Sequence, residues 1–263
     1  MTQQPLDTSP PVRIVPGVEA DRLATAVYAA LLADLGGLSP SDWEQPTECA
    51  GRTVRDVVAH LVGAAQGHAS LPVLVRQYIW GLRNRRAFGG SSLDAMNQYE
   101  IDGQADLSPD LLVASLARLA PLAVAGRSRR ARRLGWAPFA IDEAGSWSEG
   151  TPSRMTMAEL CAVVLTRDVW AHRLDIARAV GRQPTLGGDV DARIVADVVA
   201  DWAARHGQPV SLILTGDAGG TFTIGASGES LTLDALDFAR LLAGRRPDGD
   251  VPDSPLWATK LLF

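Results

Sequence analysis

Hydrophobic residues recur at three- and four-residue intervals through most of the first 183 positions. This spacing gathers them on one face of a helix, so it predicts a series of amphipathic helices. Thr53 and Asp56 form a predicted capping box at the start of one helix, and Thr156 and Glu159 form another. The helical segments predicted in this way are 18–35, 53–69, 71–86, 108–124 and 156–180.

Helix-breaking residues are expected to interrupt this region. Pro121 should kink or end the helix that begins at Ser108 and Pro109. The stretch 126–155 has an irregular pattern that includes an arginine-rich run, so it predicts a long connection between helices. Connections of that length are often functional or mobile.

The pattern changes after residue 183. A helix is predicted over 189–206, and the three segments that follow it alternate apolar and polar residues or are rich in β-branched residues. They predict two or three antiparallel strands. A last helix is expected to begin at the N-cap Thr232 and to end at Gly244.

Three parts follow from this change of pattern. Residues 1–16 are expected to be a flexible leader, residues 17–183 a helix bundle, and residues 184–263 a smaller α/β domain. The predicted fold class is therefore α+β.

Composition narrows the classes of protein. Hydrophobic residues make up 46% and charged residues 21% of 263 positions, as in folded globular chains with a sizeable core. The net charge of −5 argues against nucleic-acid binding through bulk electrostatics. The N-terminus lacks the apolar region of a signal peptide, and no apolar run has the length of a membrane span. Cys49 and Cys161 lack disulfide or zinc-site spacing, so a cytoplasmic protein with free thiols is expected.

Asp168, His172 and Asp175 lie on one predicted helix at spacings that place them on the same face. A carboxylate and an imidazole four residues apart can bind one divalent metal ion, and bundles supply further ligands from facing helices. His60, within the apolar helix 53–69, is the candidate third ligand. Asp175 is then placed to orient His172 through a hydrogen bond.

Each of these residues also has a structural interpretation. A single histidine on an apolar helix face is more often a packing residue than a ligand, and the Asp-x-x-x-His spacing recurs by chance. The arginine run 127–133 is interpreted as a solvated charge run, or else as a contact for phosphate or an anionic substrate. Cys49 has no identifiable basic partner and is interpreted as a structural thiol. His68 has polar neighbours and is expected at the surface.

Two stretches of the chain resemble one known family. LSPSDWEQPTECAGRTVRDVVAHLVG (38–63) and LTRDVWAHRLDIARAVGR (165–182) resemble the metal-site segments of the mycothiol-dependent maleylpyruvate isomerase family, within the DinB-like superfamily. Residues 94–112 and 238–249 also fit, so the resemblance covers most of the chain in order. It implies a DinB-like four-helix bundle that binds metal, followed by a smaller sterol-carrier-like α/β domain.

The resemblance also implies a ligand set and a cofactor. It places one divalent metal ion, usually zinc, on His60, Asp168 and His172, with an open position for water or the thiol of mycothiol. Arg245 matches an arginine of the C-terminal domain that assists catalysis in the isomerase. Two departures stand out, because Asp168 replaces a glutamate and Arg52 replaces a tryptophan.

These features predict an enzyme, a zinc-dependent and mycothiol-using transferase or isomerase. It would activate a thiol for attack on a small electrophile such as an activated alkene or an epoxide. The departures favour a substrate other than maleylpyruvate. The alternatives are a non-catalytic protein that binds metal and a small ligand, and an interaction module. The expected partners are the electrophile and a low-molecular-weight thiol, with no nucleic acid and no membrane, in a monomer or homodimer.

Overall fold

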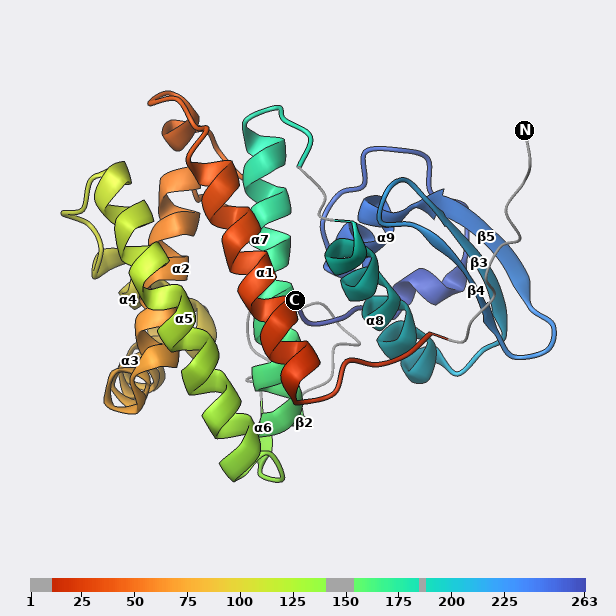
Figure 1. Ribbon diagram of the computed structural model, residues 1–263, viewed down its shortest axis with the longest axis horizontal. Coiled ribbons are helices and arrows are strands. Elements are labelled where there is room, and N and C mark those ends of the chain that lie inside the picture. Colours follow the sequence, from red (N-terminus) through yellow and green to blue (C-terminus); the bar gives the residue numbers. More distant parts are fainter. Residues whose placement is uncertain (1–10, 141–153, 185–187) are drawn as a thin grey trace. The chain divides into compact units, whose positions relative to one another are not determined.

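The computed structural model describes residues 11–140, 154–184 and 188–263 (Figure 1). The chain forms two compact units. Within the described residues, the larger unit is mainly helical with one pair of short strands, and the smaller one combines helices with a three-stranded sheet. The predicted α+β class is therefore confirmed.

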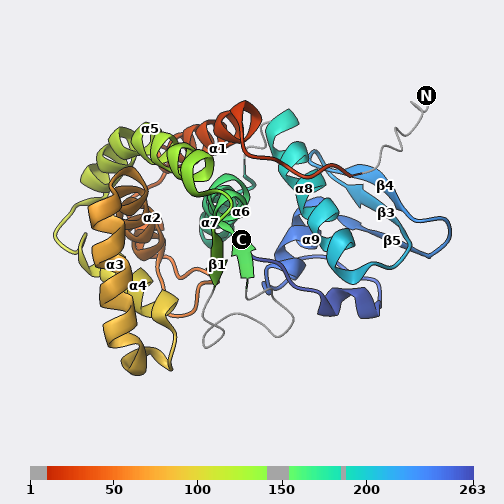
Figure 2. The same cartoon turned by 90° about the horizontal axis from the view of Figure 1, so that it is seen from below.

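Four helices form the bundle of the larger unit. They are α1 (Val18–Leu35), α2 (Val54–Ala69), α5 (Pro109–Leu134) and α7 (Leu165–Ala179). Both α1 and α2 contact both α5 and α7, which closes the bundle around one core (Figure 2). Each large apolar side chain buried there contributes about 1.5–3 kcal/mol. The fully buried side chains of this core include those of Leu23, Leu31, Leu61, Leu112, Leu116, Trp170 and Ile176.

Two further helices pack on each other and on α2. They are α3 (Leu71–Asn84) and α4 (Ser92–Asp102), joined through a 3₁₀ turn at Arg85–Phe88. The helix α4 was not among the predicted elements, because its short sequence has few apolar residues. It begins at Ser91, whose hydroxyl accepts a hydrogen bond from the backbone N–H of Asp94 at 3.0 Å.

A glycine in α2 allows α4 to approach closely. A Cβ added to Gly63 would lie 2.5 Å from the Cβ of Glu100, which is closer than real Cβ atoms approach. The absence of a side chain at Gly63 thus lets α4 bring Glu100 against α2. The glutamate is 3% exposed in this position.

The helix α5 continues through Pro121 to Leu134, so the irregular stretch predicted from residue 126 is wrong for residues 126–134. Pro121 leaves the carbonyl of Ala117 without its helical N–H partner. Both residues are exposed, so water can satisfy that carbonyl. The arginine run therefore lies on a bundle helix, whereas residues 141–153 of the predicted stretch lie outside the described chain.

Among the described helices, α5 is the one whose length and hydropathy would allow it to span a membrane. Its buried residues pack against α1 and α2, and Arg127 near its end is 2% exposed. These contacts are those of a core helix in the bundle.

The segment before α7 also departs from a simple helix. The strands β1 (Pro138–Ala140) and β2 (Arg154–Thr156) pair in antiparallel fashion. Thr156 then caps the short helix α6 (Met157–Glu159) by accepting the backbone N–H of Glu159 at 3.1 Å. A π-helical turn at Leu160–Val164 leads into α7. Such turns are frequent at functional sites, and this one directly precedes the turn that carries Asp168.

The smaller unit contains α8 (Asp189–His206), α9 (Ala235–Leu242) and a sheet of three strands in the order β4-β3-β5. A 3₁₀ turn at Pro255–Ala258 follows, and Trp202 of α8 packs between Phe238 and Trp257 at ring distances of 5.3 and 5.4 Å. The strands are β3 (Val210–Thr215), β4 (Gly220–Ile224) and β5 (Glu229–Asp234).

Two details of the smaller unit differ from the predictions. The pair β3–β4 is antiparallel, but β3–β5 is parallel. The link between β4 and β5 passes the start of β3, where a Cβ added to Gly228 would lie 1.8 Å from the carbonyl oxygen of Pro209. The N-cap of α9 is Asp234, which accepts two backbone N–H groups, whereas Thr232 lies within β5.

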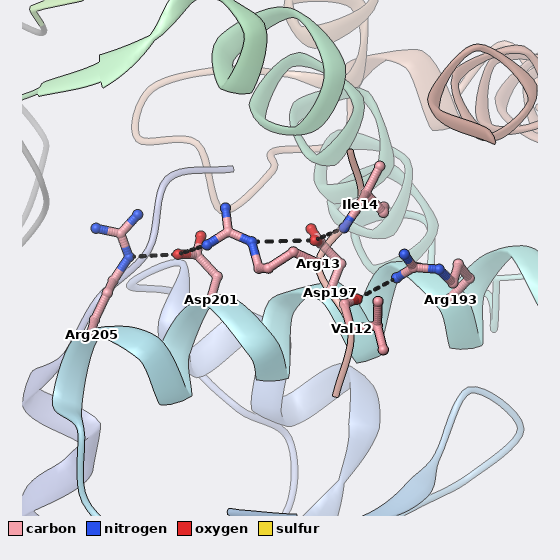
Figure 3. A network of polar contacts seen from close by, with 7 residues as sticks. All are labelled: Val12, Arg13, Ile14, Arg193, Asp197, Asp201 and Arg205. Atoms are coloured by element: carbon pink, nitrogen blue, oxygen red, sulfur yellow. Dashed lines mark hydrogen bonds and ion pairs between the residues drawn. The ribbon is translucent and has the colours of Figure 1, made fainter. Parts of the chain in front are cut away.

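Hydrogen bonds and ion pairs hold residues 12–14 against α8 (Figure 3). The backbone N–H of Ile14 donates to Asp197 at 2.6 Å, and the Arg13 guanidinium donates to Asp201 at 2.8 Å. Arg193 donates in turn to the carbonyl of Val12 at 2.8 Å. Asp197 is fully buried, and the Ile14 N–H and the Arg13 Nε, which lies 3.5 Å from its Oδ1, compensate a carboxylate that has lost its water.

Candidate metal centre

The helices α2 and α7 bring three predicted ligands together. His60 lies on α2, while Asp168 and His172 lie one turn apart on α7. One ligand atom from each residue lies within 4.8 Å of the other two. The His172 Nε2 atom is 3.4 Å from Asp168 Oδ1, and the imidazole ring centres of His60 and His172 are 5.3 Å apart.

The chemistry and exposure of this group fit a divalent metal ion. Two imidazoles and one carboxylate are a ligand set used by catalytic zinc and suited to other first-row metals. The side chains of His60, Asp168 and His172 are 13%, 26% and 14% exposed. Solvent or a small ligand can therefore reach the group, as an open coordination position requires.

Asp175 lies behind His172. Its Oδ2 atom is 3.3 Å from His172 Nδ1, and its side chain is fully buried. The thiol of Cys49 also contacts this pair, with its Sγ atom 3.7 Å from His172 Nδ1 and 3.6 Å from Asp175 Oδ2. Contact with Asp175 leaves Nε2 of His172 as the nitrogen that faces Asp168.

The Cys49 thiol has a basic neighbour, contrary to the interpretation from sequence. A tight turn delivers it to α7: the backbone N–H of Arg52 donates to the carbonyl of Cys49 at 2.9 Å, and Gly51 adopts a left-handed φ of 73°. Cys49, His172 and Asp175 form a second group with ligand atoms within 4.8 Å of one another. The described residues thus contain two candidate metal groups that share His172.

Glu100 is a site residue that the sequence did not reveal. Its Oε2 atom lies 2.9 Å from His60 Nδ1, in an ion-pair contact without the alignment of a good hydrogen bond. Burial raises the pKa of Glu100, and His60 opposes this only in part. The contact occupies Nδ1 of His60, so Nε2 remains for a ligand bond. The only signal in the sequence was that Glu100 is an acidic residue in a weakly apolar segment. No local pattern indicated that it would contact His60.

The charges of α7 stabilise one another. Burial opposes protonation of His172, but the Asp168 carboxylate and hydrogen bonds with Asp168, Asp175 and Cys49 raise its pKa well above the usual value. Burial would likewise raise the pKa of Asp168, yet the charge and hydrogen bond of His172 lower it. The pair therefore favours a carboxylate beside an imidazolium, and a metal cation would take the place of that proton.

Other candidate residues lie elsewhere. His68 is partly buried rather than at the surface. Arg245 follows α9 in the smaller unit, where its backbone N–H donates to the carbonyl of Arg240 at 2.8 Å. Its catalytic role and the orienting role of Asp175 stay predictions, as does metal binding by the three ligands.

Solved structures share the fold. The crystal structures of a mycothiol-dependent maleylpyruvate isomerase and of a histidine-to-alanine mutant match with TM-scores of 0.55 and 0.54. Each has 17% sequence identity, over 90% of this chain and 95% of the other. At this identity the likeness shows the fold alone.

The sequence itself identifies the family. No curated protein matches the chain. The model of the family described as "Mycothiol maleylpyruvate isomerase N-terminal domain" matches residues 24–177, more than half of the chain, and this segment contains α2, α5 and most of α7, with all three predicted ligands. The chain therefore belongs to the mycothiol maleylpyruvate isomerase family.

Proposed function

We propose that this protein is a zinc-dependent enzyme that uses mycothiol to attack a small electrophile, as an isomerase or a transferase. The observation that carries the proposal is the convergence of His60, Asp168 and His172 within 4.8 Å, in a partly exposed position, in a chain of this family. The solved relative is named as a mycothiol-dependent isomerase, which supports the choice of thiol.

The residues of the chain have distinct tasks in this proposal. His60, Asp168 and His172 hold the metal, which when bound would lower the pKa of a coordinated thiol and favour the thiolate. Glu100 and Asp175 contact the Nδ1 atoms of the two histidines and so orient each Nε2 toward the ligand position.

The substrate is proposed to differ from maleylpyruvate. Asp168 has a side chain one methylene shorter than the glutamate implied by the family resemblance, so the position of its carboxylate relative to α7 differs. Arg245 remains the proposed catalytic arginine of the C-terminal domain. We also propose that the protein is cytoplasmic, where its two free cysteines stay reduced, and that it acts as a monomer or homodimer.

Metal analysis combined with a thiol-dependence assay tests the function. The purified protein should contain about one zinc per chain, and turnover of an activated alkene or an epoxide should require both metal and mycothiol. Chelation should abolish turnover, and added zinc should restore it. Metal binding without turnover of any electrophile would favour the non-catalytic alternative, and mycothiol-dependent turnover by metal-free protein would overturn the proposal.

Substitution of the buried Asp175 tests how His172 is oriented. Asp175→Asn should weaken metal binding by about 10–100-fold, because a neutral amide holds the imidazole less firmly and makes it less basic. A competition titration with a chromophoric chelator measures the affinity. The matched control is Asp110→Asn, which neutralises an exposed carboxylate of the same unit. Equal affinities in the two variants would show that Asp175 has no orienting role.

A further inference from the structure

Three side chains in the bundle each keep a buried nitrogen without a hydrogen-bond partner in the described part of the chain. The atoms are Arg127 Nη2, Arg130 Nη2 and His68 Nδ1. Arg127 is 2% exposed, and Arg130 is partly buried. A buried donor without an acceptor is costly, and more so when it carries charge. Two such guanidinium nitrogens in one region, beside an imidazole nitrogen that also lacks a partner, indicate that an acceptor belongs there.

Close packing of α2 and α5 brings these residues into one cluster. A Cβ added to Gly126 would lie 2.0 Å from the carbonyl oxygen of His68, so the two backbones are in direct contact. Arg127 is the next residue of α5, and Arg130 follows almost one turn later. Burial, together with the charges of Arg127 and Arg130, lowers the pKa of His68 well below its usual value.

The same cluster is fixed to α1 and α7. Arg127 Nη1 donates to the carbonyl of Leu165 at 2.7 Å, and its guanidinium lies 5.6 Å from the ring centre of Tyr28. Burial raises the pKa of Tyr28, so its hydroxyl stays neutral. Within the described residues, neither Arg127 nor Arg130 pairs with a carboxylate. The buried guanidinium of Arg127 and the partly buried one of Arg130 therefore lack a counterion in the described part of the chain.

The cluster lies beside the candidate metal centre. Leu165, whose carbonyl binds Arg127, is three residues before Asp168, or about 4.5 Å along the helix axis. His68 is eight residues after His60, or about 12 Å along α2. Asp168 also acts electrostatically on His68. Arg127 therefore contacts the helix turn that directly precedes the candidate ligand Asp168.

We propose that Arg127, Arg130 and His68 form a buried subsite for a carboxylate of the substrate. This rests on the proposed function and narrows it: the substrate is a short electrophile that carries a carboxylate. Guanidinium groups suit this role because they hold a planar carboxylate with charge-assisted hydrogen bonds. The arginine run thus contains two anion-binding residues, while Arg129 between them is exposed.

Binding of propionate to the metal-loaded protein tests the subsite without requiring turnover. Propionate should bind and raise the melting temperature, whereas its neutral isostere propionamide should do neither. Arg130→Gln should weaken propionate binding by about 10–100-fold, as expected for loss of a charged hydrogen bond. Arg130→Lys should restore part of the affinity, and the matched control Arg129→Gln should bind like the wild type.

Further measurements separate this subsite from other sources of binding. Chelation of the metal should leave propionate binding in place, whereas a carboxylate bound only to the metal would lose it. Inorganic phosphate and chloride should compete weakly, and equal binding of these ions would overturn the assignment to a substrate carboxylate. If a variant unfolds at too low a temperature for the melting assay, its affinity for propionate can be measured by isothermal titration calorimetry instead. Equal propionate affinity in Arg130→Gln and the wild type would also overturn the proposal.

Turnover provides a second readout if the proposed function holds. The enzyme should prefer acrylate over acrylamide in kcat/KM, and Arg130→Gln should reduce that preference about 10-fold or more. If Arg130→Gln loses propionate binding but neither it nor the wild type turns over any electrophile, the result would reject the proposed reaction and support the subsite. Turnover with an unchanged preference in Arg130→Gln would reject the subsite but support the reaction.

Discussion

Substitution of His60 by alanine should remove the bound metal, whereas Cys49→Ser should leave it in place. The two candidate groups share His172, but His60 and Asp168 belong to one group, and Cys49 and Asp175 belong to the other. Loss of a direct ligand should weaken metal binding by more than the roughly 10–100-fold that loss of an orienting residue costs. Metal content after dialysis and a chelator competition titration measure the effect.

The control removes a histidine from the smaller unit. His206→Ala should retain the metal, because His206 ends α8 and its Nδ1 accepts the backbone N–H of Gln208. Circular dichroism and thermal unfolding should confirm that His60→Ala is folded, since Glu100 loses its partner in this variant. The opposite pattern, with metal kept in His60→Ala and lost in Cys49→Ser, would assign the metal to Cys49, His172 and Asp175.

Gly126→Ala should destabilise the protein by about 1–3 kcal/mol, even though alanine is the better helix former. An alanine Cβ would meet the backbone carbonyl of His68 at 2.0 Å, so α2 and α5 would have to separate. Backbone atoms cannot turn aside as a flexible side chain can. Urea denaturation followed by circular dichroism measures the change in the free energy of unfolding.

The neighbouring Ala125 provides the matched comparison. It is exposed on the same helix, so Ala125→Gly should cost about 1 kcal/mol through helix propensity alone. Both substitutions are thus expected to destabilise, although propensity alone predicts opposite signs. Stabilisation by Gly126→Ala would contradict the close approach of α2 and α5 and would weaken the placement of His68 against Arg127.

Local sequence patterns predicted most helices of the bundle and the part of the candidate metal centre that lies on α7. The capping box of Thr53 and Asp56 is confirmed at the start of α2, since both reciprocal hydrogen bonds are present. The common face of Asp168, His172 and Asp175 follows from helical spacing, because all three lie on one helix. His60 was predicted as the third ligand because it lies in an apolar helix, and the family resemblance supported its pairing with α7, since periodicity alone does not specify which helix a residue faces.

Contacts between distant segments account for what the patterns missed. Glu100 lies 40 positions after His60 along the chain, on a helix with weak periodicity, and Gly63 admits it through close packing. Cys49 gains its basic neighbour from a residue 123 positions later. The parallel pairing of β5 with β3 similarly depends on the path of the link past Pro209.

The sequence alone determined the α+β class, most helix boundaries and the three ligand candidates, because periodicity, caps and spacing act over a few residues. Only the tertiary structure decided that α5 continues past Pro121 and buries Arg127, and that Glu100 and Cys49 contact His60 and His172. Burial and charge compensation depend on which surfaces meet, and these contacts join residues far apart in the chain.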